Sequence, residues 1–371
     1  MKIIHCADLH LDSRMTSNLN PDKAKERKAE ILNTFVNMVD YASAHEVDAI
    51  IIAGDMFDTS NISALTRNTV ERTIRSNKDI EFYYLMGNHD RDNFLSGLES
   101  IPDNLFLFTD SFITYYPKGN QNITITGIEL NAENNNGVAN SLLLSPSRFN
   151  IVTMHGQESV SVGKDKTQIV NIKELRNKNI DYLALGHIHS FSEGKIDERG
   201  NFCYSGCLEG RGFDETGTKG FVLLEIDEKN RKIKPVFIKS SIRIIYKNNI
   251  DITNLEFYSE ILDKILLEVR DVSESSLIKI NLTGQVSEKA EVLAESFEKQ
   301  LYERFFCVRI YDETETKIDY EKYRNDFSLK GEFVRLVESK NISEKQKSFI
   351  IKTGLRALAG KSLNQENLIC L

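Results

Sequence analysis

The chain has 371 residues, of which 40% are hydrophobic and 27% are charged, and its formal net charge at pH 7 is −8. This composition is typical of a soluble globular protein, and it excludes collagen-like, low-complexity and disordered chains. The length allows about two domains, and the longest uncharged stretch, residues 134–147, is mostly polar, which excludes a membrane-spanning helix of about 20 apolar residues.

The first 90 residues alternate between strand and helix patterns. Residues 2–6 (KIIHC) form a short apolar run that is typical of a buried strand, and residues 21–44 place apolar side chains at helical spacing behind Pro21. The same alternation continues with a strand at residues 47–53, a helix at residues 63–76 and a strand at residues 80–86. It predicts an α/β fold in which helices pack on a parallel sheet.

Four more apolar runs are typical of strands, and beyond residue 240 the pattern changes to a smaller α-β-α-β unit. The four runs are residues 123–128, 150–154, 182–185 and 220–226. The smaller unit has helical patterns at residues 255–269 and 287–302 and extended patterns at residues 277–282 and 305–311. Helical patterns at residues 331–338 and 343–358 follow. We therefore expect a main domain at residues 1–240, a small α/β domain at residues 241–325 and a helical segment at residues 326–371.

The cysteines and the first residues of the sequence indicate where in the cell the protein is located. Five cysteines form an odd and scattered set: Cys6, Cys203, Cys207, Cys307 and Cys370. Secreted domains stabilised by disulfides rarely show such a set, so we expect reduced thiols. The opening residues, MKIIHCADLH, contain no apolar core of a secretory signal. We therefore expect a cytoplasmic protein without a cleaved signal.

Most of the histidines follow predicted strands. Of the seven in the chain, five lie just past a strand, and acidic or amide residues accompany them. Because the carboxyl ends of the strands in an α/β sheet meet at one edge, we expect these side chains to lie close together. The histidines are His10, His89, His155, His187 and His189, and their companions are Asp8, Asp55, Asp58, Asn88 and Asp90. His5 lies inside the first strand and is expected to be a core residue.

This set of side chains predicts a metal site. Imidazole, carboxylate and amide ligands without thiolate suit manganese, iron or zinc ions. They are not typical of a structural zinc site, which is rich in cysteine. Asp8 and His10 are two residues apart at a strand end, so in extended backbone both point to one side and can chelate one ion. Two neighbouring ions need a bridging ligand, and Asp55 is the candidate carboxylate. One such motif alone would be explained by a turn or a cap; all of them in this order predict a di-metal site.

The same motifs resemble those of a known superfamily. Asp8-x-His10, Gly54-Asp55-x-x-Asp58, Gly87-Asn88-His89-Asp90, His155 and Gly186-His187-x-His189 resemble the five motifs of the calcineurin-like metallophosphoesterases. Within that superfamily, DLHLDS at residues 8–13 and ALGHIH at residues 184–189 resemble the SbcD family of DNA repair exonucleases, and LEGRGFDETGTKG at residues 208–220 resembles its YhaO-like branch. The resemblance implies a sandwich of β-sheets flanked by helices, with a small α/β capping domain and C-terminal helices.

The resemblance also implies residue roles. Two divalent ions, manganese first and iron or zinc as alternatives, would generate a hydroxide near neutral pH and clamp the phosphate for in-line attack. His89 would protonate the leaving oxygen, with Asp90 or a backbone carbonyl fixing its tautomer. Asp58 is either the partner of a ligand imidazole or a turn residue. Asp8, His10 and His189 would hold one ion and Asn88, His155 and His187 the other, with Asp55 shared between them.

Three functions compete. The resemblance to SbcD implies a DNA exonuclease and endonuclease, with an SbcC-like coiled-coil ATPase docked on the basic tail helices and a homodimer as the assembly. The alternative is a phosphatase or cyclic-nucleotide phosphodiesterase. Phosphoprotein phosphatases of the superfamily carry an arginine after the second motif, whereas Thr59, Ser60 and Asn61 stand here, which favours a diester substrate. A non-catalytic scaffold should have lost a ligand or His89, and none is missing.

Overall fold

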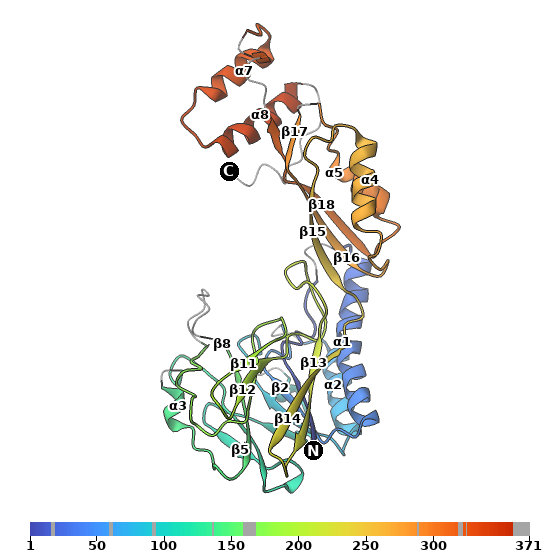
Figure 1. Ribbon diagram of the computed structural model, residues 1–371. Coiled ribbons are helices and arrows are strands. Elements are labelled where there is room, and N and C mark those ends of the chain that lie inside the picture. The colour runs from blue at the N-terminus through green and yellow to red at the C-terminus, as the bar shows by residue number, and fades with distance from the viewer. Residues whose placement is uncertain are drawn as a thin grey trace. The chain divides into compact units, whose positions relative to one another are not determined.

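A computed structural model describes residues 1–15, 19–58, 62–90, 94–135, 137–158, 168–287, 289–317, 322–323 and 325–358. The chain divides into two compact units, Met1–Ile245 and Tyr246–Leu371 (Figure 1). The structure groups the smaller α/β unit and the tail helices together, so the expected boundary near residue 325 stays a prediction. Among the described residues, no helix is long and apolar enough to cross a membrane.

The first unit contains two six-stranded sheets, and the first sheet has the strand order β14-β13-β1-β2-β3-β4. The predicted parallel core is confirmed, because β1 pairs with β2, β2 with β3 and β3 with β4 in parallel. The strands β13 and β14 extend the sheet in the antiparallel sense. The bounds are β1 Lys2–Cys6, β2 Ala49–Ala53, β3 Glu81–Leu85, β4 Leu105–Leu107, β13 Gly220–Asp227 and β14 Lys232–Lys239.

The helices α1 (Pro21–Ala44) and α2 (Ala64–Ser76) connect the first three strands and have the predicted bounds to within a residue. The side chain of Asn20 caps α1 by accepting the backbone N–H of Lys23, and Pro21 occupies the first turn, where a missing N–H costs nothing. Both helices pack on the outer face of the first sheet, as Figure 1 shows for this unit. Ser63 caps α2 in the same way.

The second sheet of this unit has the order β11-β12-β10-β7-β6-β5. Its inner face packs against the first sheet, since Ile51 and Tyr83 share one buried cluster with Ile151 and Tyr182. The central strands are buried on both faces, which is why they read as continuous apolar runs. The bounds are β5 Ile113–Tyr115, β6 Ile123–Gly127, β7 Phe149–His155, β10 Tyr182–Gly186, β11 Ser192–Lys195 and β12 Asn201–Tyr204. The predicted sandwich of sheets flanked by helices is confirmed.

Short elements complete the first unit. A second cluster of apolar side chains covers the outer face of the second sheet and includes Val138 and Ala139 of the single-turn helix α3. The remaining pieces are two short 3-10 helices and a two-stranded pair. Their bounds are α3 Val138–Ser141, η1 Leu95–Gly97, η2 Pro117–Gly119, β8 Gln157–Glu158 and β9 Ile169–Val170.

The second unit is built on a three-stranded sheet of order β15-β16-β18. Two helices pack on it, and their side chains Phe297 and Ile261 are fully buried in one apolar cluster with residues of the strands. The predicted helix at residues 287–302 begins only at Ala294, because residues 285–287 pair as β17 with β19 instead. The bounds are β15 Ile245–Asp251, α4 Tyr258–Glu268, β16 Leu277–Thr283, β17 Gln285–Ser287, α5 Ala294–Leu301, β18 Cys307–Asp312, β19 Glu315–Lys317, α7 Leu329–Glu338 and α8 Glu344–Leu358.

Candidate metal centre

The predicted site residues meet where strands of both sheets of the first unit end. Asp8 and His10 follow β1, Asp55 follows β2, and Asn88 follows β3. From the second sheet come the last residue of β7, His155, and the two histidines after β10, His187 and His189. Every one of the seven predicted ligands contacts at least one other member of the set.

The backbone that carries these ligands is not extended. Asp8, His10, Asp55 and His187 all have positive φ angles, of 53°, 44°, 52° and 98°. The expectation that Asp8 and His10 continue the extended strand is therefore wrong, because β1 ends at Cys6. Left-handed backbone at residues other than glycine costs about 1–3 kcal/mol each and is concentrated at functional sites. Hydrogen bonds between the loops hold it, such as that from the N–H of Asp8 to the carbonyl of Gly54 (3.0 Å).

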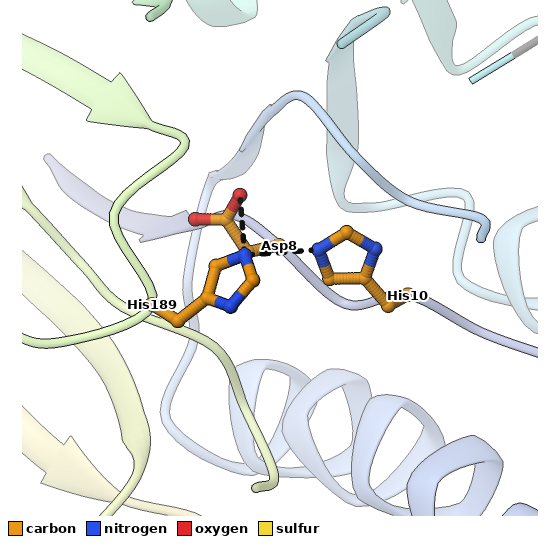
Figure 2. A group of neighbouring side chains, drawn as sticks. All are labelled: Asp8, His10 and His189. Carbon is orange, nitrogen blue, oxygen red and sulfur yellow. Dashed lines mark hydrogen bonds and ion pairs between the residues drawn. The ribbon is translucent and has the colours of Figure 1, made fainter. Parts of the chain in front are cut away.

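One group of ligands is formed by Asp8, His10 and His189, whose ligand atoms lie within 4.8 Å of one another (Figure 2). The Nε2 atoms of His10 and His189 are 3.1 Å apart, and Oδ1 of Asp8 is 3.9 Å from Nε2 of His189. A single proton can bridge these two imidazole nitrogens, one donating and the other accepting, but it leaves the carboxylate of Asp8 outside that bond. A divalent cation between them would satisfy all three, so these residues fit a metal ion.

A second group is formed by Asn88, His155 and His187. Oδ1 of Asn88 lies 3.1 Å from Nε2 of His155 and 3.4 Å from Nδ1 of His187. Asp55 lies between the two groups, because its Oδ2 is 3.3 Å from Nε2 of His155 and 3.8 Å from Nε2 of His10. One carboxylate thus reaches histidines of both groups, which is the position expected for a bridging ligand.

The electrostatics of the site favour cations. Burial opposes the ionisation of Asp55, yet its hydrogen bond and charge interactions with His155 and His10 hold the pKa of Asp55 well below its usual range. Burial likewise opposes a charge on His155, but the neighbouring Asp55 raises the pKa of His155 to about 9. The carboxylate of Asp55 therefore stays ionised and attracts positive charge, which a metal ion can supply in place of a proton.

The ligands are held by further contacts. Nδ1 of His155 lies 2.8 Å from the carbonyl oxygen of Ala53, so that a proton on Nδ1 leaves the lone pair of Nε2 directed at the site. Nδ1 of His189 lies 2.7 Å from Oε1 of Glu215. The backbone N–H of His187 donates to the carboxylate of Asp8 (2.9 Å to Oδ1).

His89 lies at the mouth of the site, with 47% of its side chain exposed. Its Nδ1 is 3.1 Å from Oδ1 of Asp58, and this contact raises the pKa of His89. The same Asp58 oxygen lies 3.3 Å from Nδ1 of His10, and Oδ2 accepts the hydroxyl of Ser13 (2.5 Å). Of the two roles considered for Asp58, the structure thus favours the partner of an imidazole over the turn residue.

Asp90 does not contact the His89 ring in the way the sequence led us to expect. Its carboxylate accepts the backbone N–H groups of Met56 (3.1 Å), Phe57 (2.8 Å) and Gly87 (3.0 Å). Those buried amides need an acceptor, and Asp90 supplies it. Burial raises the pKa of Asp90 to about 6. Asp90 therefore shapes the loops around the site, and Asp58 takes the place beside His89.

Two residues of the site were missed from the sequence. Glu215 contacts His189, and Arg211 contacts both Glu215 and Asp58. Both belong to residues 208–220, whose sequence was used only as a marker of resemblance. Charged residues in a glycine-rich segment between two strands were the signal that could have drawn attention to them.

The other sequence expectations have clear outcomes. His5 is fully buried, with Nδ1 3.0 Å from the hydroxyl of Tyr182, and is a core residue as expected. The four cysteines in the described part of the chain form no disulfides, and none belongs to the candidate metal groups found there. Cys370 and residues 59–61, on which the choice of a diester substrate depended, lie outside the described residues.

Comparisons with known proteins agree with this geometry. The family model of the calcineurin-like phosphoesterases matches residues 1–191. The uncharacterized metallophosphoesterase YhaO of Bacillus subtilis is 26% identical over 300 residues, which cover 78% of this chain and 73% of that protein. The SbcD component of the nuclease SbcCD from Staphylococcus saprophyticus is 28% identical, covering 64% of this chain and 68% of its own. The DNA double-strand break repair protein Mre11 of Saccharolobus solfataricus is 29% identical, covering 51% of this chain and 50% of that protein.

Proposed function

The chain belongs to the calcineurin-like phosphoesterase family, and on that premise we propose that it is a metal-dependent phosphodiesterase that hydrolyses DNA. The observation that carries the proposal is the meeting of seven nitrogen and oxygen ligands with one half-exposed histidine, His89, at the ends of strands. The similarity to a component of the nuclease SbcCD and to a DNA break repair protein supports DNA as the substrate.

We assign the ligands to two subsites. The first consists of Asp8, His10 and His189, and the second of Asn88, His155 and His187, with Asp55 shared. Two divalent ions held by these residues would supply a nucleophile near neutral pH and would stabilise the charge that develops on the phosphate. Manganese is our proposed ion, and iron and zinc suit the same nitrogen and oxygen ligands.

His89 is the proposed general acid. A proton on Nδ1 is held by Asp58, so the ring can release the proton on Nε2 to the leaving oxygen of the substrate. The ring is held from the backbone as well, because the N–H of His89 donates to Oδ1 of Asp55 (2.9 Å). The exposure of the His89 ring leaves it accessible to a polymer, as a nuclease requires.

We further propose that the tail helices bind an SbcC-like coiled-coil ATPase. Ile350 and Leu355 lie on the apolar stripe of α8, but they pack against α7 in a cluster that contains Val334 and Val337. Other apolar side chains remain exposed there, and they are the better candidates for such a contact: Phe327, Leu329 and Leu336. A cytoplasmic homodimer is the proposed assembly, since two-fold dimers are the commonest oligomers.

The test compares two substrates and two variants. The metal-free chain receives Mn²⁺ and then either 3′-labelled double-stranded DNA or bis-p-nitrophenyl phosphate. We expect hydrolysis of both, and a loss of about 10²- to 10⁴-fold in kcat for His89→Ala. His45→Ala is the matched control, because His45 is an exposed histidine at the end of α1 and should leave both activities unchanged.

Two results would contradict the proposal. Hydrolysis of the small diester with DNA left intact, even after the ATPase partner is added, would favour the alternative of a small-molecule or cyclic-nucleotide enzyme. Unchanged activity of His89→Ala on both substrates would remove His89 from its proposed role.

A further inference from the structure

The segment that joins β12 to β13 supplies none of the proposed ligands, yet it contacts one ligand histidine, His189, through Cys207, Arg211, Glu215 and Lys219. Oε1 of Glu215 lies 2.7 Å from Nδ1 of His189, and Nζ of Lys219 donates to the backbone carbonyl of His189 (2.7 Å). Both charged side chains are buried, with Glu215 4% and Lys219 3% exposed. Burying charged groups is costly unless each has a partner. Glu215 contacts the imidazole of His189 and the guanidinium of Arg211, and Lys219 donates to the backbone carbonyl of His189.

Arg211 extends these contacts to the other side of the site. Its Nη2 donates to Oε1 of Glu215 (2.7 Å), and its backbone N–H donates to Oε2 of the same carboxylate (2.7 Å). Its Nη1 is 3.4 Å from Oδ1 of Asp58. One guanidinium therefore lies between the carboxylate that contacts His189 and the carboxylate that contacts His10 and His89. Such two-sided contacts suit arginine, whose planar fork fits carboxylates.

The segment is itself fixed to the first sheet's outer layer. Glu209 forms an ion pair with Arg27 of α1 (2.9 Å), and both side chains are fully buried. The other oxygen of Glu209 accepts the backbone N–H of Ile242 (2.5 Å), and Arg27 also donates to the carbonyl of Gly210 (2.6 Å). The residues directly before Arg211 are thus anchored to α1 and to Ile242, which follows β14.

The two proposed subsites differ in the groups that contact the outer nitrogen, Nδ1, of His10, His189 and His155. In the first subsite, His189 is backed by the carboxylate of Glu215 and His10 by that of Asp58. In the second subsite, His155 is backed by the neutral carbonyl of Ala53. A carboxylate behind a ligand imidazole fixes the ring and raises its basicity, and losing it costs about 10- to 100-fold in metal affinity or activity.

We propose that residues 207–220 form a brace in which Glu215 and Arg211 are positioning residues that set the metal affinity of the first subsite separately from the second. This inference rests on the two-subsite assignment of the proposed function. It gives a physical role to a stretch of sequence that carries no ligand and no catalytic group.

The test titrates the full, metal-free chain with Mn²⁺ by calorimetry, and electron paramagnetic resonance of free Mn²⁺ counts the bound ions. For Glu215→Gln, we expect one of the two ions to bind about 10- to 100-fold more weakly and the other to be unchanged. In Asn88→Ala, where the second subsite is damaged, the remaining ion should weaken by the same factor when Glu215→Gln is added. Glu225→Gln, which removes an exposed carboxylate on β13, is the matched control.

Variants of Arg211 test the same proposal independently of Glu215. Arg211→Ala should weaken the same ion, and Arg211→Lys should recover part of the loss, because lysine keeps the charge but not the fork. If Glu215→Gln fails to fold, as judged by its circular dichroism, the less buried Arg211 carries the test alone.

The outcomes separate the two proposals. Equal weakening of both ions, or no change in either, overturns the brace whether or not DNA is cleaved. Selective weakening in a chain that binds two ions but leaves DNA intact, both alone and with the ATPase partner, supports the brace and overturns the nuclease. A chain that binds no Mn²⁺ overturns both.

Discussion

Gly54 begins the loop after β2 with a φ of 92°, and a Cβ added there would lie 2.1 Å from Nδ1 of His155. We expect Gly54→Ala to displace the His155 ring and to weaken Mn²⁺ binding, with a loss of about 1–3 kcal/mol in the free energy of unfolding from the backbone alone. Calorimetric titration and denaturant unfolding measure the two effects. Gly119→Ala is the control, because Gly119 has a similar φ of 68° but no atom within 4 Å of the added Cβ. Equal effects at both glycines would exclude the contact with His155 as the cause.

His5 predicts a pH dependence of stability. Burial lowers the pKa of His5 to about 3, whereas a histidine in the unfolded chain titrates near 6.5. Between these values the unfolded chain binds a proton that the folded chain does not, so stability falls as the pH falls. From pH 7 to pH 5 this histidine should remove about 2 kcal/mol from the free energy of unfolding.

Urea unfolding of the metal-free chain at the two pH values, beside His5→Gln, isolates this effect from other groups. The wild-type chain should lose about 2 kcal/mol more than the variant. An equal loss in both would mean that His5 is protonated in the folded state.

The ligand residues could be predicted from the sequence because each lies at or just past the end of an apolar strand. The end of such a strand can be recognised from a few consecutive residues. The left-handed backbone at Asp8 and Asp55 could not be predicted, because loop-to-loop hydrogen bonds impose it. The contacts of Glu215 and Asp58 also depend on residues far along the chain. His89 and Asp90 are neighbours in sequence, yet their side chains have different partners.

At the scale of elements, the apolar patterns located β1 and α1 with their observed bounds. Local spacing decides β1, and the cap at Asn20 with Pro21 in the first turn sets the start of α1. Edge strands such as β14 were missed. Its partly exposed residues, from Lys232 to Lys239, alternate too weakly to be distinguished from a loop. The start of α5 was placed too early, because the pairing of β17 with β19 is a long-range contact.

The ion pair between α1 and the 207–220 segment supports a prediction at this scale. Arg27→Met leaves Glu209 buried without its cation, and we expect the free energy of unfolding to fall by about 3–5 kcal/mol. Denaturant unfolding measures it. Arg75→Met is the control: Arg75 pairs with Glu71 on the surface of α2, and such exposed pairs contribute about 0–1 kcal/mol. Similar losses in the two variants would show that the buried pair does not fix the segment.

At the scale of the whole molecule, charge limits how strongly this chain can hold DNA. Its 47 lysine and arginine residues are outnumbered by 55 aspartate and glutamate residues. Affinity for DNA depends largely on cations that neutralise phosphates, and each such contact makes binding more sensitive to salt. The proposed activity on DNA therefore requires either a local basic surface on this chain or a partner that binds the DNA. The two cases differ in the affinity of the isolated chain for duplex DNA.

We expect the isolated chain to bind duplex DNA weakly, with a dissociation constant of about 1–100 μM at 150 mM salt, the range of non-specific complexes. Fluorescence anisotropy of a labelled duplex with His89→Ala measures this without cleavage. Hydrolysis of bis-p-nitrophenyl phosphate by the unmodified chain should change little between 50 and 200 mM salt, because that substrate carries a single charge. A nanomolar dissociation constant at 150 mM salt would contradict the prediction and would locate the DNA-binding surface within this chain, since no partner is then needed to hold the duplex.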